Sequence, residues 1–456
     1  METKDKYYQR ILEGFSDWDF IKPSNEIVSA MKGSIDETFL SVTARVTAPV
    51  LVSYIIWVLQ DANARGIDTL LFVARDGFVM YKIAKILCEA WGIDITCKYF
   101  YASRFSLRLP MYGVDKGYAL DKLCDPDAGN TTLQAVLVAA GLSPEQAACI
   151  SKEICINLSD KLSKDQLKSL KVVLSGNQRF NELALNSANM ALEAARRYFA
   201  QEVPSHPKNF AIVDSGWAGS IQGSFGKLYQ HFTRHSSAKI NGYYFGMIKS
   251  PPRDTGIYKC FYFSHNTGFS RFRNFCIDLF ECLCAAGHGK VLGYDNENES
   301  QWMMPVLDNN IASYCDIWDA QTQIMLCEKY AKGFAEHNPW PNKNDSIKMV
   351  QKLLRAFMQN PSKNEAKVYG AIPFSRGVLE GDIGTLARTL TPQELRHYTF
   401  SNRIKTKFSQ SSVDEAQPIF WIPGAIALSK VSFVKKFDVK MLLATYWLKV
   451  RMTSRG

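Results

Sequence analysis

The chain has 456 residues, of which 46% are hydrophobic and 21% charged, and its formal net charge is +10. This length allows a large core with two or three lobes, and the composition excludes an intrinsically disordered chain. The positive excess fits a phosphate-rich ligand, a nucleic acid or an anionic membrane surface, and by itself it does not choose among them.

The eleven cysteines are scattered and form no CxxC pair, so their spacing predicts no zinc site. The first residues are polar and lack the apolar core of a signal peptide. We therefore expect a reduced, cytoplasmic protein. The longest apolar run, over 46–59, is interrupted by Thr47, Pro49 and Ser53, which predicts a buried helix rather than a membrane span.

Hydrophobic patterning divides the chain into five parts. They are a leader without strong pattern over 1–37, the first part of an α/β core over 38–110, a helical insertion over 111–203, the second part of the core over 204–300, and a mostly helical region over 301–456. The first core part predicts a strand–helix–strand unit. Its elements are a leading helix over 39–64, a strand over 69–73, a helix over 78–91 and a strand over 93–101.

A second strand–loop–helix unit lies over 209–230. The apolar run 210–213 predicts a buried strand with Asp214 at its end, and 221–229 can form a helix. Between them Ser215, Gly216, Gly219 and Ser220 predict a small-residue loop. Backbone N–H groups at such a loop and helix start can hold an anion, and an Asp at the strand end can hold sugar hydroxyls or Mg²⁺. The alternative is an ordinary turn capped by the Asp.

Loops at the carboxyl ends of parallel strands meet at one crevice, so we expect Arg75 and Asp214 at the same mouth. An Arg on one loop and an anion site on the other suit a ligand with two phosphate groups, because guanidinium groups bind phosphate bidentately. Lys82 adds charge beyond the first loop. The alternative for Arg75 and Asp76 is an internal ion pair that stiffens a turn.

Four motifs carry a resemblance to a known family. They are Phe-Val-Ala-Arg-Asp-Gly at 72–77, Tyr-Ala-Ser-Arg at 101–104, Val-Asp-Ser-Gly-Trp-Ala-Gly-Ser-Ile-Gln at 213–222 and Gly-Tyr-Tyr-Phe-Gly at 242–246. They resemble phosphoribosyltransferase-like modules of bacterial capsule and O-antigen clusters, which are often fused to a HAD-type hydrolase. The resemblance implies the type I phosphoribosyltransferase fold, an α/β fold with a parallel sheet and helices on both faces.

The resemblance also implies an activity. Such a module transfers 5-phosphoribose from phosphoribosyl diphosphate, with Mg²⁺, to a hydroxyl of a surface glycan that can be lipid-linked, and a separate HAD-type phosphatase removes the 5-phosphate. Asp214 is implied to hold ribose hydroxyls and metal, and Asp76 or Glu281 to act as base. The implied substrate-binding residues are Arg75, Gly77, Lys82, Arg104, Ser215, Gly216, Trp217, Gly219, Ser220 and Gln222.

The chain departs from the phosphoribosyltransferase pattern at two positions. Ser215 stands where a second acidic residue is usual, and Trp217 is foreign to the salvage enzymes. Two alternatives therefore stay open, a non-catalytic ligand-binding or regulatory protein of this fold and a nucleotide-salvage phosphoribosyltransferase. For Glu281 the alternative is a solvated helix face shared with Asp278.

Two further expectations concern partners. The tyrosines of the predicted strands lack a basic setting, so we expect no nucleic-acid partner. The segment 434–455 is apolar and basic. It predicts either an amphipathic last helix packed on the core or a peripheral contact with the inner face of the membrane.

Overall fold

A central sheet of five parallel strands organises the protein. The structure, a computed structural model, describes residues 3–15, 17–125, 131–249, 256–296, 302–308, 319–340, 345–374, 384–399, 401, 419–429 and 431–453. The sheet order is β2-β1-β5-β6-β7, and every neighbouring pair is parallel. The strands are β1 (Thr69–Val73), β2 (Thr96–Phe100), β5 (Phe210–Trp217), β6 (Ile240–Met247) and β7 (Gly256–Phe263).

Strand periodicity explains why helices cover both faces of the sheet. Leu70 and Phe72 of β1 join one hydrophobic cluster, and Leu71 and Val73 join another, because successive side chains of a strand point to opposite faces. All five residues of β1 are buried, which is typical of a parallel strand between two helical layers. The α/β class predicted from the sequence is confirmed.

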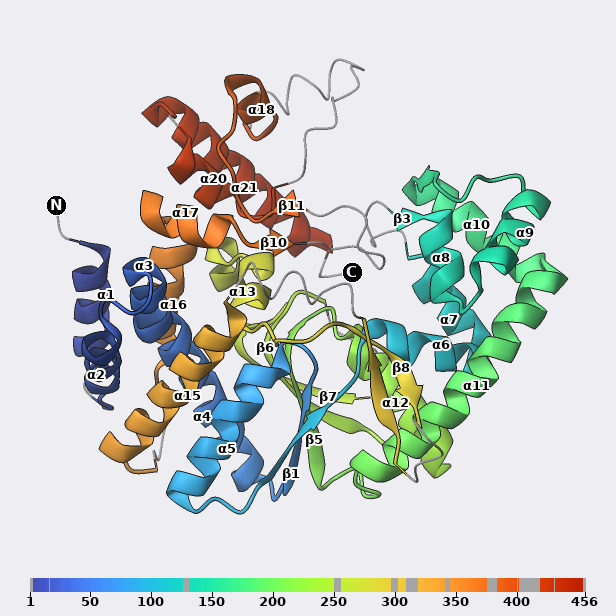
Figure 1. The fold of residues 1–456 in the computed structure, drawn as a ribbon, viewed down its shortest axis with the longest axis horizontal. Helices are drawn as coiled ribbons and strands as arrows, with labels where there is room; N and C mark the ends of the chain where they lie inside the picture. The colour runs from blue at the N-terminus through green and yellow to red at the C-terminus, as the bar shows by residue number, and fades with distance from the viewer. Residues whose placement is uncertain are drawn as a thin grey trace.

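The first layer combines helices from both ends of the chain, which Figure 1 shows in blue and orange on one side of the sheet. A π-helical segment η1 (Thr43–Thr47) joins α3 (Glu37–Val42) to α4, so the predicted helix over 39–64 is continuous. The other members are α4 (Ala48–Ala64), α5 (Gly77–Trp91), α13 (Ile277–Leu283), α15 (Ala320–His337), α16 (Ile347–Leu354), η5 (Arg355–Gln359), α17 (Lys363–Gly370) and α20 (Ile422–Leu428).

The second layer is the helical insertion together with α12 (Ser220–Thr233), drawn in cyan and green on the other side of the sheet in Figure 1. Insertion helices α6 and α11 pack against each other, and α6 also contacts α12. The insertion comprises α6 (Arg104–Val114), α7 (Lys116–Leu123), β3 (Thr131–Thr132), α8 (Leu133–Ala139), α9 (Pro144–Glu153), β4 (Lys161–Leu162), α10 (Lys164–Gly176) and α11 (Gln178–Glu202).

The amino-terminal residues are an integral part of the first layer, so describing 1–37 as a leader without pattern was wrong. They form α1 (Lys4–Glu13) and α2 (Ile21–Met31), and Tyr8 is fully buried. The Tyr8 hydroxyl donates to Glu365 at 2.5 Å, and the buried Arg45 donates to Asp5 at 2.5 Å. The scattered apolar residues of α1 and α2 are buried against η1 and against the distant helices α15 and α16.

The remaining elements follow the sheet in the chain. Helix α21 packs on the core through Trp447, whose indole N–H donates to the Phe269 carbonyl at 3.2 Å, while the side chains of Lys435, Lys436, Lys449 and Arg451 lie outside the described part. These elements are η2 (Phe269–Asn274), β8 (Val291–Asp295), β9 (Met304–Leu307), β10 (Pro373–Phe374), β11 (Gly384–Thr385), α18 (Pro392–His397) and α21 (Phe433–Thr453).

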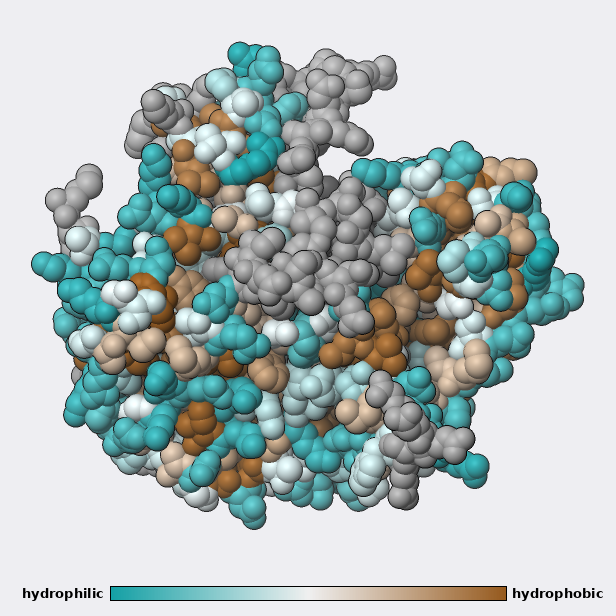
Figure 2. All heavy atoms as spheres, in the orientation of Figure 1, coloured by the Kyte–Doolittle hydropathy of each residue, from teal (hydrophilic) through white to brown (hydrophobic). Residues whose placement is uncertain are grey.

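Among the described residues, one helix, Glu37–Ala64, is long and apolar enough to cross a membrane. Within the protein, 94% of its most apolar window is buried, as the interrupted apolar run predicted for a core helix. Hydrophilic residues cover most of the face in Figure 2, with apolar residues interspersed among them.

Candidate active site

The sheet order changes direction between β1 and β5. After β1 the chain adds β2 on one side, and it later returns to add β5, β6 and β7 on the other. In open α/β sheets the carboxyl ends of the strands at such a switch point leave a crevice, because their connections run to opposite faces. Here a cavity of about 230 Å³ opens at that place, and both Arg75 and Asp214 line it. The prediction that these two residues share one mouth is confirmed.

Local sequence determines how the first loop enters the cavity. Helix α5 begins at Gly77, directly after Arg75 and Asp76, with a cis peptide bond between Ala74 and Arg75. A Cβ atom at Gly77 would lie 2.9 Å from the backbone carbon of Phe72, so only glycine fits this close approach of helix and strand. Gly77 therefore allows α5 to start close against β1, and it does not line the cavity.

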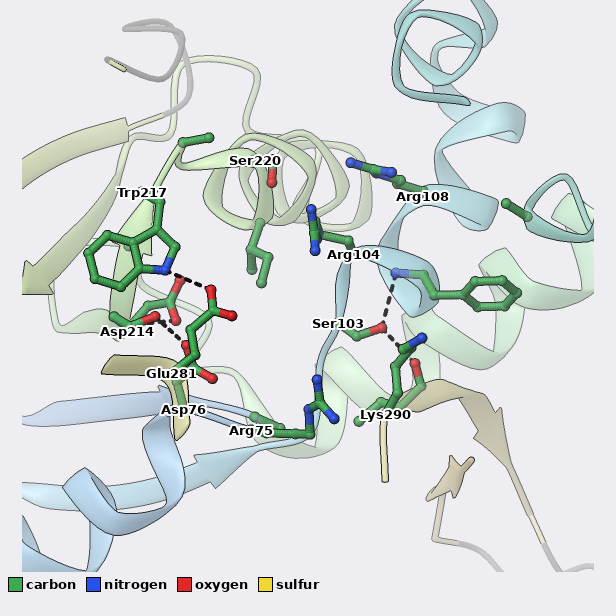
Figure 3. Close-up of a pocket in the computed structure, with 18 residues that line it drawn as sticks. Arg75, Asp76, Ser103, Arg104, Arg108, Asp214, Trp217, Ser220, Glu281 and Lys290 are labelled. Carbon is green, nitrogen blue, oxygen red and sulfur yellow. Dashed lines mark hydrogen bonds between the residues drawn. The ribbon is translucent and has the colours of Figure 1, made fainter. Parts of the chain in front are cut away.

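Helix α6 supplies two arginines to the cavity. Ser103 caps the helix by accepting from the backbone N–H of Ser106 at 3.1 Å, and its hydroxyl donates to the Val291 carbonyl at 2.6 Å. This cap fixes the first turn, so Arg104 and Arg108 lie one turn apart on the same face. Figure 3 shows both side chains extending towards Ser220 at the start of α12.

The cationic wall consists of Arg75, Arg104, Arg108 and Lys290. Within the described residues, none of the three guanidinium groups makes a hydrogen bond or a salt bridge. Burial, and then the neighbouring charge of Arg104, lower the pKa of Arg108 to about 10. A partly buried arginine beside a second one is stabilised by an anion, so this wall has the chemistry to bind a phosphate-type ligand.

Three carboxylates face this wall: Asp76, Asp214 and Glu281 (Figure 3). Burial, and then the charge of Asp76, raise the pKa of Asp214 to about 8. Burial, and then Asp76 and Asp278, raise the pKa of Glu281 to about 8. Burial also raises the pKa of Asp76, while a hydrogen bond from Ser215 and the charges of the arginines oppose the rise. Such perturbed acids in a cleft are typical of ligand-binding or catalytic sites.

Ser215 connects two of these acids. Its hydroxyl donates to Asp76, and its backbone N–H donates to the Asp214 carboxylate at 2.9 Å. Ser215 thus holds the carboxylate of Asp76, from the loop after β1, beside Asp214 of β5. The site therefore contains an acidic pair drawn from that loop and from β5.

The loop after β5 differs from the prediction. Strand β5 continues through Asp214, Ser215, Gly216 and Trp217, because Gly216 and Trp217 pair with Gly246 and Met247 of β6. The predicted small-residue loop shrinks to Ala218 and Gly219, so most of it was wrong. Helix α12 starts next, its N-cap Gly219 has a φ of 64°, and no side chain caps it. The start of this helix faces the cavity through Ser220 and remains suited to an anion.

Besides Gly77 and Gly219, the predicted site residues Lys82 and Gln222 do not line the cavity. The Lys82 ammonium pairs with Glu328 of α15 at 3.3 Å. Gln222 is fully buried, its amide donates to the Ile240 carbonyl at 2.7 Å, and it accepts from the Tyr244 hydroxyl. Both predictions of substrate contact were therefore wrong, because one side chain faces the outer helix layer and the other packs between α12 and the sheet.

Sequence reasoning missed Arg108 and Lys290. Arg108 had a detectable signal, since it follows Arg104 by four residues in a segment that begins with a capping serine. Lys290 follows Gly289 in a stretch without periodicity, and only the tertiary fold brings it to the cavity.

Magnesium fits the carboxylate side of the cavity only together with a ligand. Within the described ranges no group of three His, Cys, Asp or Glu side chains is close enough to enclose a metal ion. Asp76 and Asp214 nevertheless offer oxygen ligands and repel each other, and a divalent cation relieves such repulsion. A diphosphate would supply the remaining oxygens.

Comparison of the chain with models of known protein families and with curated proteins finds no match.

Proposed function

We propose that this chain is a glycosyltransferase-type enzyme that transfers 5-phosphoribose from phosphoribosyl diphosphate to a hydroxyl of a bacterial surface glycan. The supporting observation is that three arginines, which have no hydrogen-bonding or ion-pair partner among the described residues, face three carboxylates across a cavity at the switch point of the sheet. The donor has matching parts, since its phosphate groups are anionic and its ribose hydroxyls lie between them.

The phosphates suit the cationic wall. Ser220 and Arg108 lie at one end of the wall, Arg75 lies towards the other, and Arg104 lies between them (Figure 3). We assign the 5-phosphate to the start of α12 with Arg108, because helix N-terminal N–H groups and a guanidinium both favour a phosphate. The diphosphate then lies against Arg75 and Lys290.

The ribose suits the carboxylate side. Asp214 and Asp76 form the acidic pair that accepts hydrogen bonds from ribose hydroxyls and offers oxygens to Mg²⁺. When bound, the ion supplies positive charge to the diphosphate as it leaves. This pair weakens the case for a non-catalytic protein, since the loop after β1 provides the acid that is missing at Ser215.

The site matches the charges of the expected transition state. Cleavage of the C1–diphosphate bond leaves positive charge on the ribose ring and negative charge on the diphosphate. The carboxylates stabilise the first charge and the arginines the second, at fixed positions that need no reorganisation. Asp76 or Glu281 is placed to accept the proton of the acceptor hydroxyl.

The acceptor and the later fate of the product come from the family resemblance. A glycan acceptor, lipid-linked at the inner face of the membrane, places the reaction in the cytoplasm. Removal of the 5-phosphate is assigned to a separate HAD-type phosphatase, which needs an Asp-x-Asp pair directly after a strand. The segment Asp17-Trp18-Asp19 has that spacing, but it lies between helices α1 and α2 and follows no strand.

The test is pyrophosphate release from phosphoribosyl diphosphate and Mg²⁺ in the presence of a panel of monosaccharide glycosides, followed by mass spectrometry. The proposal predicts release with addition of a phosphopentosyl group to a glycoside. Release only with a nucleobase would instead favour the salvage enzyme. Donor binding without any release would favour the non-catalytic protein, and a plain pentosyl addition would reveal a phosphatase site in this chain.

A further inference from the structure

Glu281 is held in place by Trp217. The indole Nε1–H of Trp217 donates to Oε1 of Glu281 at 2.9 Å (Figure 3). Among the described residues no partner binds the second carboxylate oxygen, and Glu281 lines the cavity. One oxygen is thus fixed by the protein, and the other is available to a ligand.

The backbone around Trp217 is unusual. Trp217 has a φ of 79°, which is rare for a bulky residue, and Gly216 before it has a φ of 116°. A Cβ atom at Gly216 would lie 2.1 Å from the Gly246 carbonyl oxygen, so only glycine fits there. Backbone strain of this kind persists where the surrounding structure holds a residue for a function.

The indole ring is locked among three phenylalanines. Its centroid lies 6.2 Å from that of Phe263, 5.3 Å from that of Phe275 and 5.8 Å from that of Phe280. With this packing the ring has little freedom, and its N–H group points at the carboxylate. Trp217 and Glu281 both line the cavity.

Of the two candidate bases, Asp76 already has other interactions. It accepts from the Ser215 hydroxyl and is paired in space with Asp214, where the ribose and Mg²⁺ are assigned. Among the described residues, Glu281 has no hydrogen bond other than the one from the Trp217 indole. We infer that Glu281 is the catalytic base for the acceptor and that Trp217 is the positioning residue that orients the Glu281 carboxylate. This inference rests on the proposed function.

Atoms and electrons are conserved in the proposed step. The acceptor oxygen forms a bond to C1 of the ribose as the bond from C1 to the diphosphate oxygen breaks. The electron pair of that bond leaves with the diphosphate. The proton of the acceptor hydroxyl moves to the free oxygen of Glu281.

Four charged groups set the pH at which Glu281 accepts a proton. The carboxylates of Asp76 and Asp278 raise its pKa after burial, and Arg104 and Arg75 lower it. A donated hydrogen bond from the indole favours the ionised form as well. Loss of that bond should therefore move the acid limb of the pH profile to higher pH.

The first test uses Trp217→Phe, which keeps the ring packing and removes the N–H donor, with the exposed Trp302→Phe as control. The probe is pyrophosphate release from phosphoribosyl diphosphate and Mg²⁺ with water as acceptor. We expect kcat to fall about 10- to 100-fold with KM for the donor unchanged, and the acid limb to shift to higher pH. Glu281→Gln should lose more activity than Trp217→Phe while still binding the donor.

The second test does not depend on turnover. The fluorescence of Trp217, taken as the difference between the wild type and Trp217→Phe, should change as Glu281 titrates and become independent of pH in Glu281→Gln. Absence of that coupling, or full activity in Glu281→Gln, overturns the inference while leaving donor binding intact. A wild-type protein that does not bind the donor overturns the proposed function, and the base assignment falls with it.

Discussion

Replacement of Asp214 by Asn separates function from folding. Asp214 lies at the cavity end of β5, beside Asp76, and only 8% of its surface is exposed. Asparagine has nearly the same shape, but it cannot ionise to the carboxylate that would hold ribose hydroxyls and Mg²⁺ when the donor binds. We expect Asp214→Asn to abolish pyrophosphate release and to leave the fold intact.

The structure gives the size of the stability effect. Burial, and then the charge of Asp76, raise the pKa of Asp214 from 3.8 to about 8. Between these values the folded protein holds a proton that the unfolded chain releases, so stability is full below 3.8 and is lost as pH rises towards 8. At pH 7 the loss is about 4 kcal/mol, since each pH unit above 3.8 costs about 1.4 kcal/mol. The Asn variant avoids this loss.

Thermal melting between pH 4 and pH 8 measures the difference in stability between the wild type and Asp214→Asn. The pyrophosphate-release assay is run in parallel. At pH 7 the variant should melt at or above the wild-type temperature, and the two curves should converge towards pH 4. Asp165→Asn, an exposed change on α10, serves as the control and should alter neither property. Retained turnover in Asp214→Asn would show that this residue only closes the strand, and a variant that melts well below wild type would refute the electrostatic reasoning.

Three other changes test the placement of individual residues. Arg108→Met should weaken donor binding about 10- to 100-fold, the loss of a charge-assisted phosphate contact of about 1.5–3 kcal/mol, as measured by calorimetry. Lys82→Met should leave donor affinity unchanged in the same titration, since Lys82 pairs with Glu328 outside the cavity, and a large loss would contradict that placement. Gln222→Ala should lower the free energy of unfolding by about 1–3 kcal/mol, because the buried Tyr244 hydroxyl loses its partner; an unchanged melting temperature would contradict this.

The core strands and the helices around the first loop were predictable from the sequence. Strand β1 matches the predicted 69–73 because it is an almost continuous apolar run, and β6 matches the predicted 240–247 because aromatic residues, which favour strands, fill its centre. Helix α5 begins one residue before the prediction. Such elements depend on local pattern, and the parallel order of β1 and β5 then follows from their connections.

Elements set by distant contacts were not predictable. Strand β5 extends to Trp217 only because β6 lies beside it, so local glycine and serine content suggested a loop. Helix α1 carries few apolar residues, and its burial depends on helices more than 300 residues away in the chain, as the Tyr8–Glu365 bond shows. Lys290 reaches the cavity through tertiary structure alone.

Isothermal titration with phosphoribosyl diphosphate and Mg²⁺ measures whether this cavity binds the proposed donor. We expect saturable binding by the wild type, strongly weakened in an Arg104→Ala, Arg108→Ala double variant that melts like the wild type. Ribose 5-phosphate and pyrophosphate alone should each bind more weakly than the whole donor, because each engages only part of the cationic wall. If the intact donor gives no heat of binding with the protein folded and Mg²⁺ present, the chain is not a phosphoribosyl diphosphate-dependent transferase.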